Sequence, residues 1–450
     1  MNVYTYIFIL NFILLVSTNS FTRPFKFLFR NFNKKIENYK SNIHKINGFY
    51  GLVGPNVDIS KTNTLYELFT GDGMIQGVFL ENGNITQVNH IIETEKIKHE
   101  KIHGKFSNGM MILPWYMFLN KMGMLPNVMG LANTAFIKVK QKIFVLFERD
   151  LPYEISLDFK EKIIQTLKKI KIHSVDHFSA HSTLDGKKHI VYSLEYNVLK
   201  NMVTLFHTDE ELNLVKKIDV SSHYLPVVHD SYILSKSTVF TDSPLEFSLN
   251  YLFRGKIPVL FNRRKPTFIH EINRKTGSKK TYSTNESFYI FHYAEMRESD
   301  SNIEIYAPLY DDLDFSELNI SGKYRKLVLD KKTNTMKIER NPELEKYNLD
   351  FPMKWRHSYI LRNIENNRIN GFIICKDLKI QRKIFLQDIS ICGEPKIYDN
   401  GVFSRIMCLG YDNNNAGYFV LIDPENGELY KFPLKESVKL GFHSIFTQIN

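Results

Sequence analysis

The sequence predicts an all-β fold. From Gly48 onward, short runs rich in Val, Ile, Tyr, Phe and Leu alternate with turns built from Asn, Asp, Gly and Lys. Helix-like patterns are few, and no repeat of fixed length is visible, which argues against a WD40 or kelch array. Strand–turn–strand units spread over a chain of 450 residues favour a propeller or a large sandwich.

Residues 1–20 are predicted to be a signal peptide-like segment. An apolar run over residues 5–16 is followed by the small polar residues Ser17, Thr18, Asn19 and Ser20. The run has the length of a signal-peptide core and is short for a membrane span. A buried N-terminal strand or helix is the alternative interpretation.

Residues 21–45 are predicted to be a basic, transit-like or flexible segment. Between Phe21 and Asn47 seven basic residues stand against one acid, Glu37, which gives +6 of the formal net charge of +11. The seven are Arg23, Lys26, Arg30, Lys34, Lys35, Lys40 and Lys45. Such a stretch behind a signal-like segment resembles the bipartite leaders of complex plastids, and it also suits the secretory or endomembrane system or a basic arm at a membrane surface. Because the remaining residues carry only +5, we expect no nucleic-acid partner.

Three hairpins are expected in the body of the chain. The first joins 189–196 to 202–208, the second joins 371–377 to 380–388, and the third joins 418–423 to 428–434. The segment 160–170 is instead expected to be a helix, because Ile163, Leu167 and Ile170 recur on one helical face.

The segment 110–130 is unusual because Met, Leu, Trp, Tyr and Phe are crowded there, with Pro114 and Pro126 between them. It is either a buried helical insertion or an apolar surface that dips into a bilayer or forms the mouth of an apolar tunnel. No run in the body reaches the roughly 18 apolar residues that a membrane span requires.

The common catalytic motifs are absent, including the phosphate-binding loop, the G-x-S-x-G elbow, H-E-x-x-H and the EF-hand loop. Three scattered cysteines, at 375, 392 and 408, exclude a disulfide framework and a cysteine zinc site. Four histidines instead lie inside apolar runs: His181, His229, His292 and His443. Each one alone is more often a hydrogen-bonded core residue, whereas together they would suit Zn, Cu or Fe. Their spacings of 48, 63 and 151 residues define no local motif.

Ten segments in a fixed order resemble the carotenoid cleavage oxygenases, most closely the plant-type carotenoid and epoxycarotenoid cleavage dioxygenases. They include INGFYGLVGPN, FTGDGMIQGVFL and SFYIFHYAEM, and each of the four histidines lies in its own matching context. The segments are 46–56, 69–80, 130–137, 146–155, 179–186, 226–240, 287–296, 349–353, 393–398 and 440–446.

The resemblance implies that residues 46–450 form a seven-bladed β-propeller with a small helical, apolar dome over a central iron site. It implies that His181, His229, His292 and His443 hold an Fe(2+) ion on the propeller axis. Neutral imidazoles suit iron, and outer carboxylates fix their tautomers.

The resemblance assigns these outer carboxylates to Glu148, Glu394 and Asp350. Asp350 departs from the family, which has a glutamate before Phe-Pro, so its bond to a histidine could be lost, water-bridged or restored by a backbone shift. Gln76 and Thr70 also depart from the family pattern, and we interpret both as local structural changes. Thr134 matches a threonine whose methyl group would crowd the open side of the iron, or it is a plain strand residue.

The implied activity is the O₂-dependent cleavage of a C=C bond in a carotenoid or apocarotenoid, with each new end becoming a carbonyl. The position of 110–130 matches the dome insertion that touches membranes in the plant-type members, which predicts peripheral membrane contact. Retinoid isomerisation, stilbene cleavage and a catalytically impaired propeller that binds pigment or lipid are the alternatives.

Overall fold

The fold was analysed in a computed structural model that describes residues 32–36, 42–58, 62, 64–107, 112–254, 257–317 and 320–448. Antiparallel strands make up most of the described chain, which confirms the all-β prediction. The signal peptide-like segment and most of the basic segment lie outside the described residues. Of residues 21–45, only the strand β1 (Phe32–Ile36) and the short 3-10 helix η1 (Asn42–Lys45) are described.

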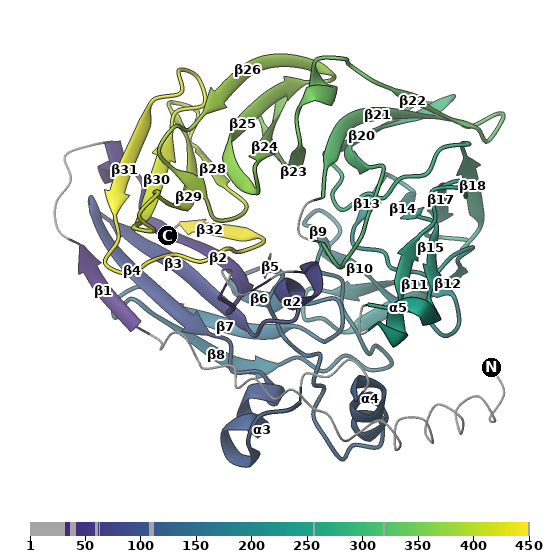
Figure 1. The fold of residues 1–450 in the computed structure, drawn as a ribbon, viewed down its shortest axis with the longest axis horizontal. Coiled ribbons are helices and arrows are strands. Elements are labelled where there is room, and N and C mark those ends of the chain that lie inside the picture. The colour runs from purple at the N-terminus through teal and green to yellow at the C-terminus, as the bar shows by residue number, and fades with distance from the viewer. Residues whose placement is uncertain are drawn as a thin grey trace.

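The strands form antiparallel sheets that follow one another around a central axis, as in a propeller (Figure 1). The first sheet has the order β1, β4 (Asn84–Ile91), β3 (Gly73–Glu81), β2 (Gly48–Pro55) and β32 (Ser444–Gln448). The second contains β5 (Ala135–Val139), β6 (Lys142–Leu146), β7 (Tyr153–Asp158) and β8 (Ile163–Lys169). The third has the order β12 (Leu214–Ser221), β11 (Met202–Asp209), β10 (Ile190–Asn197) and β9 (Thr183–Asp185).

The remaining sheets continue the ring. One has the order β13 (Ser231–Ile233), β14 (Ser237–Asp242), β17 (Phe268–Asn273) and β18 (Lys279–Ser283), and a separate pair consists of β15 (Leu245–Phe247) and β16 (Val259–Phe261). The next contains β19 (Glu295–Glu298), β20 (Asn302–Tyr310), β21 (Gly322–Asp330) and β22 (Met336–Glu339). A nine-stranded sheet comprises β23 (Leu349–Trp355), β24 (Ser358–Glu365), β25 (Arg368–Lys376), β26 (Lys379–Phe385), β27 (Ser390–Ile391), β28 (Lys396–Asp399), β29 (Ser404–Tyr411), β30 (Gly417–Ile422) and β31 (Leu429–Pro433). Because this sheet joins two strand groups through β27, the count of seven blades stays a prediction.

The ring is closed by strands from opposite parts of the sequence. β32 pairs with β2, so that Phe446 lies opposite Tyr50 and Ser444 lies opposite Leu52. The last described strand therefore completes the first sheet, and β32 and β2 lie toward the centre of the ring in Figure 1, whereas β1 lies at its outer edge.

The hydrophobic core is divided into clusters that lie between neighbouring sheets. Between the first and second sheets, for example, Phe49 and Phe79 pack with Val145, and the two rings lie 4.8 Å apart. A similar cluster packs Phe240 against Leu194, joining the fourth sheet to the third. Burying a side chain of this size contributes roughly 1.5–3 kcal/mol, so these contacts hold adjacent sheets together.

All three predicted hairpins are confirmed, as β10–β11, β25–β26 and β30–β31.

The predicted helix over 160–170 is wrong, because the segment forms β8 at the outer edge of the second sheet. Ile164 is buried, whereas Ile163 and Leu167 are 40% and 48% exposed, so the apolar face that suggested a helix faces outward instead. Isoleucine and threonine favour a strand, and pairing with β7 decides the outcome.

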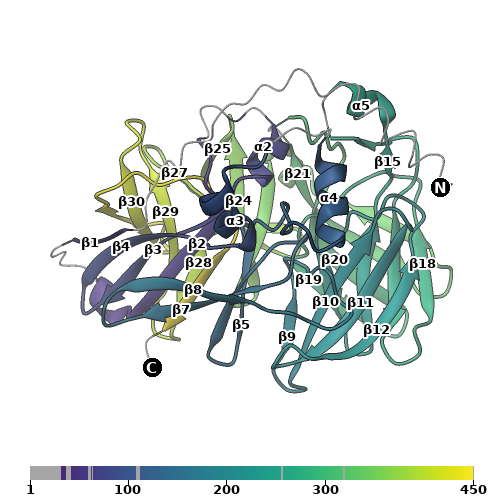
Figure 2. The ribbon, with the colours of Figure 1, turned by 90° about the horizontal axis from the view of Figure 1, so that it is seen from below.

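The helices are short. They are α2 (Leu65–Phe69), α3 (Glu95–His103), α4 (Leu113–Lys121), α5 (Leu249–Phe253) and the 3-10 helix η3 (Leu344–Lys346). Figure 2 places α2, α4 and α5 toward the same side of the strand ring, while a dome over the central site stays a prediction. Among the described residues, no helix is long and apolar enough to cross a membrane.

The helix α4 within the segment 110–130 is exposed. None of its residues is buried, and Met122 and Met124, which follow it, are 61% and 69% exposed. The rings of Trp115 and Phe118 stack on each other at 5.6 Å, and both are exposed to solvent. The interpretation of this segment as a buried helical insertion is therefore wrong for α4, although Val128 further along the segment is buried.

Candidate metal centre

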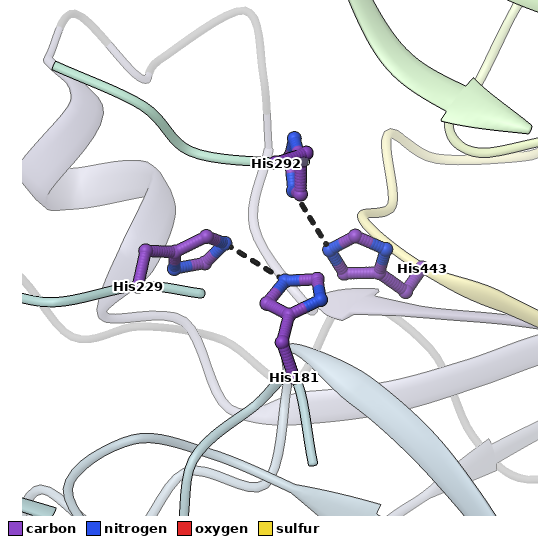
Figure 3. Close-up of side chains that lie close together, drawn as sticks. All are labelled: His181, His229, His292 and His443. Atoms are coloured by element: carbon purple, nitrogen blue, oxygen red, sulfur yellow. Dashed lines mark hydrogen bonds between the residues drawn. The ribbon is translucent and has the colours of Figure 1, made fainter. Parts of the chain in front are cut away.

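The four candidate histidines come from corresponding places in four sheets. His181, His229, His292 and His443 each lie one to three residues before a strand, namely β9, β13, β19 and β32. Each of these strands is the terminal strand at one end of its sheet. Histidines that are far apart in the sequence therefore meet, and their rings face one another in Figure 3.

The histidine rings are close enough to share one ion. One nitrogen from each ring can be chosen so that all four nitrogens lie within 4.8 Å of one another. The Nε2 atoms of His181 and His229 are 3.0 Å apart, and those of His292 and His443 are 3.3 Å apart. His292 and His443 are both buried. The geometry thus gathers all the predicted ligands at one point, while metal binding itself stays a prediction.

Three carboxylates contact the outer nitrogens of these rings. Glu148 contacts Nδ1 of His229. The distance from Asp350 Oδ1 to His292 Nδ1 is 2.8 Å, and the distance from Glu394 Oε1 to His443 Nδ1 is 3.5 Å. The structure therefore places all three predicted carboxylates beside a histidine. Within the described residues, His181 has no carboxylate on its ring.

The hydrogen-bonding pattern fits a cation at the centre. A carboxylate accepts the Nδ1–H of its histidine, which leaves the Nε2 of that neutral ring with a lone pair. The Nε2 atoms of His292 and His443 would then be two acceptors facing each other at 3.3 Å, which is unfavourable unless a positive charge lies between them. A divalent ion with imidazole affinity satisfies this donor set.

Burial keeps two of the rings neutral. It lowers the pKa of His443 to about 4 and that of His181 well below its usual value, and neighbouring histidines lower the pKa of His181 further. Neutral imidazole is the form that binds a metal, so these two ligands are ready for an ion at neutral pH.

The strand that carries Asp350 is irregular directly after this residue. A β-bulge interrupts the pairing of β23 with β24 between Asp350 and Met353, and Phe351 adopts a positive φ of 53°. The bulge therefore lies directly beside the acid that contacts His292. Burial raises the pKa of Asp350, but the interactions with His292, Arg362 and Tyr310 outweigh it and hold the pKa at about 2.

Two residues that the sequence did not indicate support Asp350. The hydroxyl of Tyr310 donates to Asp350 Oδ2 at 2.5 Å. Arg362 lies opposite Asp350 in β24, and its guanidinium lies 3.4 Å from the centre of the Phe351 ring. Neither residue follows a recognisable motif, because both reach the site from strands outside the segment that carries Asp350.

Glu394 is held in place by the backbone next to His443. Its Oε2 accepts the N–H of Ser444 at 2.8 Å and lies 3.2 Å from Lys396 Nζ. Burial opposes ionisation, but the charges of Lys396 and His443 together with these hydrogen bonds lower the pKa of Glu394 far below its usual value. The carboxylate is therefore ionised and oriented toward His443.

The segment that carries His443 is bound by residues from the start of the chain. Gln76, which departs from the family pattern, is buried and forms two hydrogen bonds with the backbone of Lys439. Gly54 of β2 approaches closely, since a Cβ there would lie 2.4 Å from Cα of Gly441. Thr134 accepts the His443 N–H with its carbonyl at 3.2 Å, while its hydroxyl donates to Asn133. Gln76 and Thr134 thus position the backbone beside a candidate ligand.

A ring of antiparallel sheets with four inward-facing histidines defines a propeller-like protein with a candidate metal centre. Residues 44–448 match the family described as Retinal pigment epithelial membrane protein. The chain belongs to this family, and the resemblance to the carotenoid cleavage oxygenases is confirmed.

Known relatives support the same placement. The carotenoid 9,10(9',10')-cleavage dioxygenase 1 of Pisum sativum is 26% identical over 275 residues, which cover 57% of this chain and 50% of that protein. The chain thus spans about half the length of this relative.

Solved structures show the same fold. A mutant of the Synechocystis apocarotenoid oxygenase superposes with a TM-score of 0.75 at 17% identity, over 93% of this chain and 96% of the other. The lignostilbene dioxygenase of Pseudomonas brassicacearum superposes with a TM-score of 0.75 at 15% identity, over 93% and 94% of the two chains.

Proposed function

We propose that this protein is an Fe(II)-dependent dioxygenase that cleaves a C=C bond of a carotenoid or apocarotenoid. The observation that carries the proposal is the cluster of four histidines, three of which are oriented by carboxylates. Similarity to the pea carotenoid-cleaving relative supports the substrate class. Residues 46–450 would form the catalytic domain.

In this proposal His181, His229, His292 and His443 hold the iron. When bound, ferrous iron would supply the one-electron chemistry that lets O₂ react with an alkene. Both oxygen atoms of O₂ enter the products, one in each new carbonyl, as the C=C bond breaks. Glu148, Asp350 and Glu394 would hold protons on the Nδ1 atoms of His229, His292 and His443, which keeps the Nε2 lone pairs of these three rings directed at the ion.

Aromatic side chains form the apolar surroundings of the centre. The ring of Phe351 lies 4.3 Å from that of His292 and 4.8 Å from that of His443, and the ring of Phe291 lies 5.4 Å from that of His229. We infer that these rings exclude water from the centre and contact the polyene. The methyl group of Thr134 would crowd the open side of the iron, and the hydrogen bond from the His443 N–H to the Thr134 carbonyl keeps this residue beside a candidate ligand.

The exposed apolar side chains around α4 support a proposal of peripheral membrane contact, which would bring the enzyme to a lipid-dissolved substrate.

We further propose that residues 1–47 direct the protein to a plastid or to the secretory or endomembrane system. Fusing them to a fluorescent reporter tests this, and a diffuse cytosolic signal would contradict it.

The activity is tested by incubating iron-replete protein with a panel of carotenoids, apocarotenoids, retinyl esters and stilbenes under O₂. We expect aldehyde or ketone fragments from a carotenoid or apocarotenoid, identified by chromatography and mass spectrometry. An isomerised retinoid or a cleaved stilbene would move the function to one of the alternatives. Intact substrates throughout would favour a binding protein.

A further inference from the structure

A second cluster of potential metal ligands lies outside the four-histidine centre. It contains His223, Asp242 and His270, whose ligand atoms lie within 4.8 Å of one another. His223 belongs to the connection between β12 and β13, Asp242 ends β14, and His270 lies within β17. The cluster therefore joins the connection after the third sheet to two adjacent strands of the fourth.

One carboxylate oxygen lies at the centre of this cluster. Oδ2 of Asp242 is 3.1 Å from His223 Nδ1 and 3.0 Å from His270 Nε2. The same carboxylate accepts the backbone N–H of His223 at 2.6 Å and the hydroxyl of Ser222 at 2.7 Å. These contacts fix the carboxylate while both imidazoles face it.

The cluster is buried on one side and open on the other. His270 and Asp242 are fully or almost fully buried, whereas the side chain of His223 is 43% exposed. The ring of His223 stacks on Phe268 at 4.3 Å. An ion could thus reach the cluster from solvent past His223 and meet two ligands that the fold already holds.

The buried histidine has the outer contact that metal-binding histidines usually have. Nδ1 of His270 lies 3.0 Å from the hydroxyl of Thr281, its cross-strand partner in β18. If Nδ1 carries the proton, Nε2 presents its lone pair toward Asp242.

We propose that His223, Asp242 and His270 form a second metal site, selective for a borderline divalent ion such as Zn²⁺. Two imidazole nitrogens and one carboxylate oxygen are a common three-ligand set for Zn²⁺, with a fourth position left to solvent. Ligand distances of about 2.0–2.2 Å in a tetrahedron place donor atoms roughly 3.3–3.5 Å apart. The present separations of 3.0 and 3.1 Å need to widen by only a few tenths of an ångström, which the exposed ring of His223 can provide.

The site would act on the segment that leads to the first centre. His223 lies six residues before His229 in the sequence. An ion held by His223, Asp242 and His270 would tie the start of this segment to β14 and β17. The consequence is a more stable protein, in which the part of the chain that carries His229 is fixed at its beginning.

The alternative for this cluster is a hydrogen-bond network without an ion, in which His270 Nε2–H and His223 Nδ1–H both donate to Asp242. Measuring the amount of zinc and iron bound per chain distinguishes the two arrangements. Iron-loaded protein is dialysed against low concentrations of ZnCl₂, and iron and zinc are measured in the same sample. We expect one zinc per chain in addition to the iron, together with a higher melting temperature.

The decisive variant is His223→Ala, which removes an exposed ligand and leaves both buried residues in place. We expect it to keep its iron, lose the bound zinc and lose the zinc-dependent rise in melting temperature. The matched control is His189→Ala, since His189 is an exposed histidine 3.1 Å from Glu210 that belongs to neither cluster. This control should bind zinc as the unaltered protein does.

A second variant tests the contact between Thr281 and Nδ1 of His270. Thr281→Val removes the partner of His270 Nδ1 and should weaken zinc binding by about tenfold or more. The proposal would be overturned if the His223→Ala variant still bound zinc. It would also be overturned if the unaltered protein bound no more zinc than the amount of iron it lost. Because iron is measured separately, failure of this site is distinguishable from failure of the four-histidine centre.

Discussion

Asp350 forms a 2.8 Å hydrogen bond with Nδ1 of His292, although an aspartate side chain is one methylene shorter than the glutamate expected before Phe-Pro. A β-bulge follows Asp350, and Phe351 has a positive φ. The hydroxyl of Tyr310 donates a hydrogen bond to the other carboxylate oxygen of Asp350. Despite the departure from the family pattern, one oxygen of Asp350 contacts His292 and the other accepts a hydrogen bond from Tyr310.

Replacing Asp350 with Asn should weaken metal binding by roughly 10–100-fold, because the neutral amide holds the Nδ1 proton of His292 less strongly. Competition with a chelator measures the affinity. The control is Asp377→Asn, which removes an exposed carboxylate that pairs with Arg297 and belongs to neither histidine cluster. Unchanged affinity in Asp350→Asn would show that the contact to His292 does not serve the metal.

Replacing His292 with Ala should abolish stoichiometric metal binding, since it removes one of four imidazoles and leaves Asp350 without its partner. Elemental analysis of the purified variant measures the effect. The exposed His357→Ala variant serves as the control and should retain its metal. Retention of iron by His292→Ala would remove His292 from the ligand set.

Replacing Tyr310 with Phe should lower the free energy of unfolding by about 1–3 kcal/mol, because a buried carboxylate oxygen loses its donor. Urea unfolding monitored by fluorescence measures this change. We expect Tyr306→Phe to cost less, since the hydroxyl of Tyr306 makes only a 3.5 Å contact with Glu304. Equal losses in both variants would mean that the contact with Asp350 has no special weight.

Replacing both Met117 and Phe118 with Glu should reduce binding to lipid vesicles at least tenfold, because exposed apolar side chains of α4 would no longer enter the bilayer. Vesicle flotation measures the bound fraction. The matched control replaces with Glu both Leu199 and Val402, which are also exposed apolar residues but belong to the β10–β11 and β28–β29 turns and not to α4. If the control loses as much binding, the contact is not specific to α4.

The stability of the protein should fall between pH 6.5 and pH 4, and His90 should account for part of the loss. Burial lowers the pKa of His90 to about 4, so in this range the unfolded chain binds a proton that the folded protein excludes. A difference of about 2.5 pKa units corresponds to roughly 3 kcal/mol once the pH is below both values.

The pH effect is measured by comparing urea unfolding of the unaltered protein and His90→Asn at several pH values. The variant should show a weaker dependence on pH, whereas His357→Asn, which changes an exposed histidine, should not. Parallel curves for the unaltered protein and His90→Asn would contradict the assignment.

Much of the fold was predictable because turns and alternation are local signals. The hairpin β30–β31 followed from the turn residues at 424–427, and strand β10 followed from its apolar run. The segment 160–170 was wrongly predicted to be a helix because Ile163, Leu167 and Ile170 fit a helical face as well as a strand. Only the pairing of β8 with β7 decides between the two structures.

The candidate centre was predictable to the extent that its residues lie in recognisable segments. The four histidines and the three carboxylates were identified from their contexts, and the structure brings them together. Tyr310 and Arg362 were not identified, because their relation to Asp350 arises from pairing and packing between strands. The cluster of His223, Asp242 and His270 was missed for the same reason.

The pairing of β32 with β2 has a consequence for the synthesis of this chain. About 390 residues separate the end of β2 from the start of β32, so a ribosome working at roughly 5–20 residues per second needs about 20–80 s between them. During that time the apolar strand β2 lacks one neighbour, and the histidine just before β32 does not yet exist. Emergence of this late segment therefore completes the ring and the candidate metal centre in one step, and an interrupted translation product would have neither.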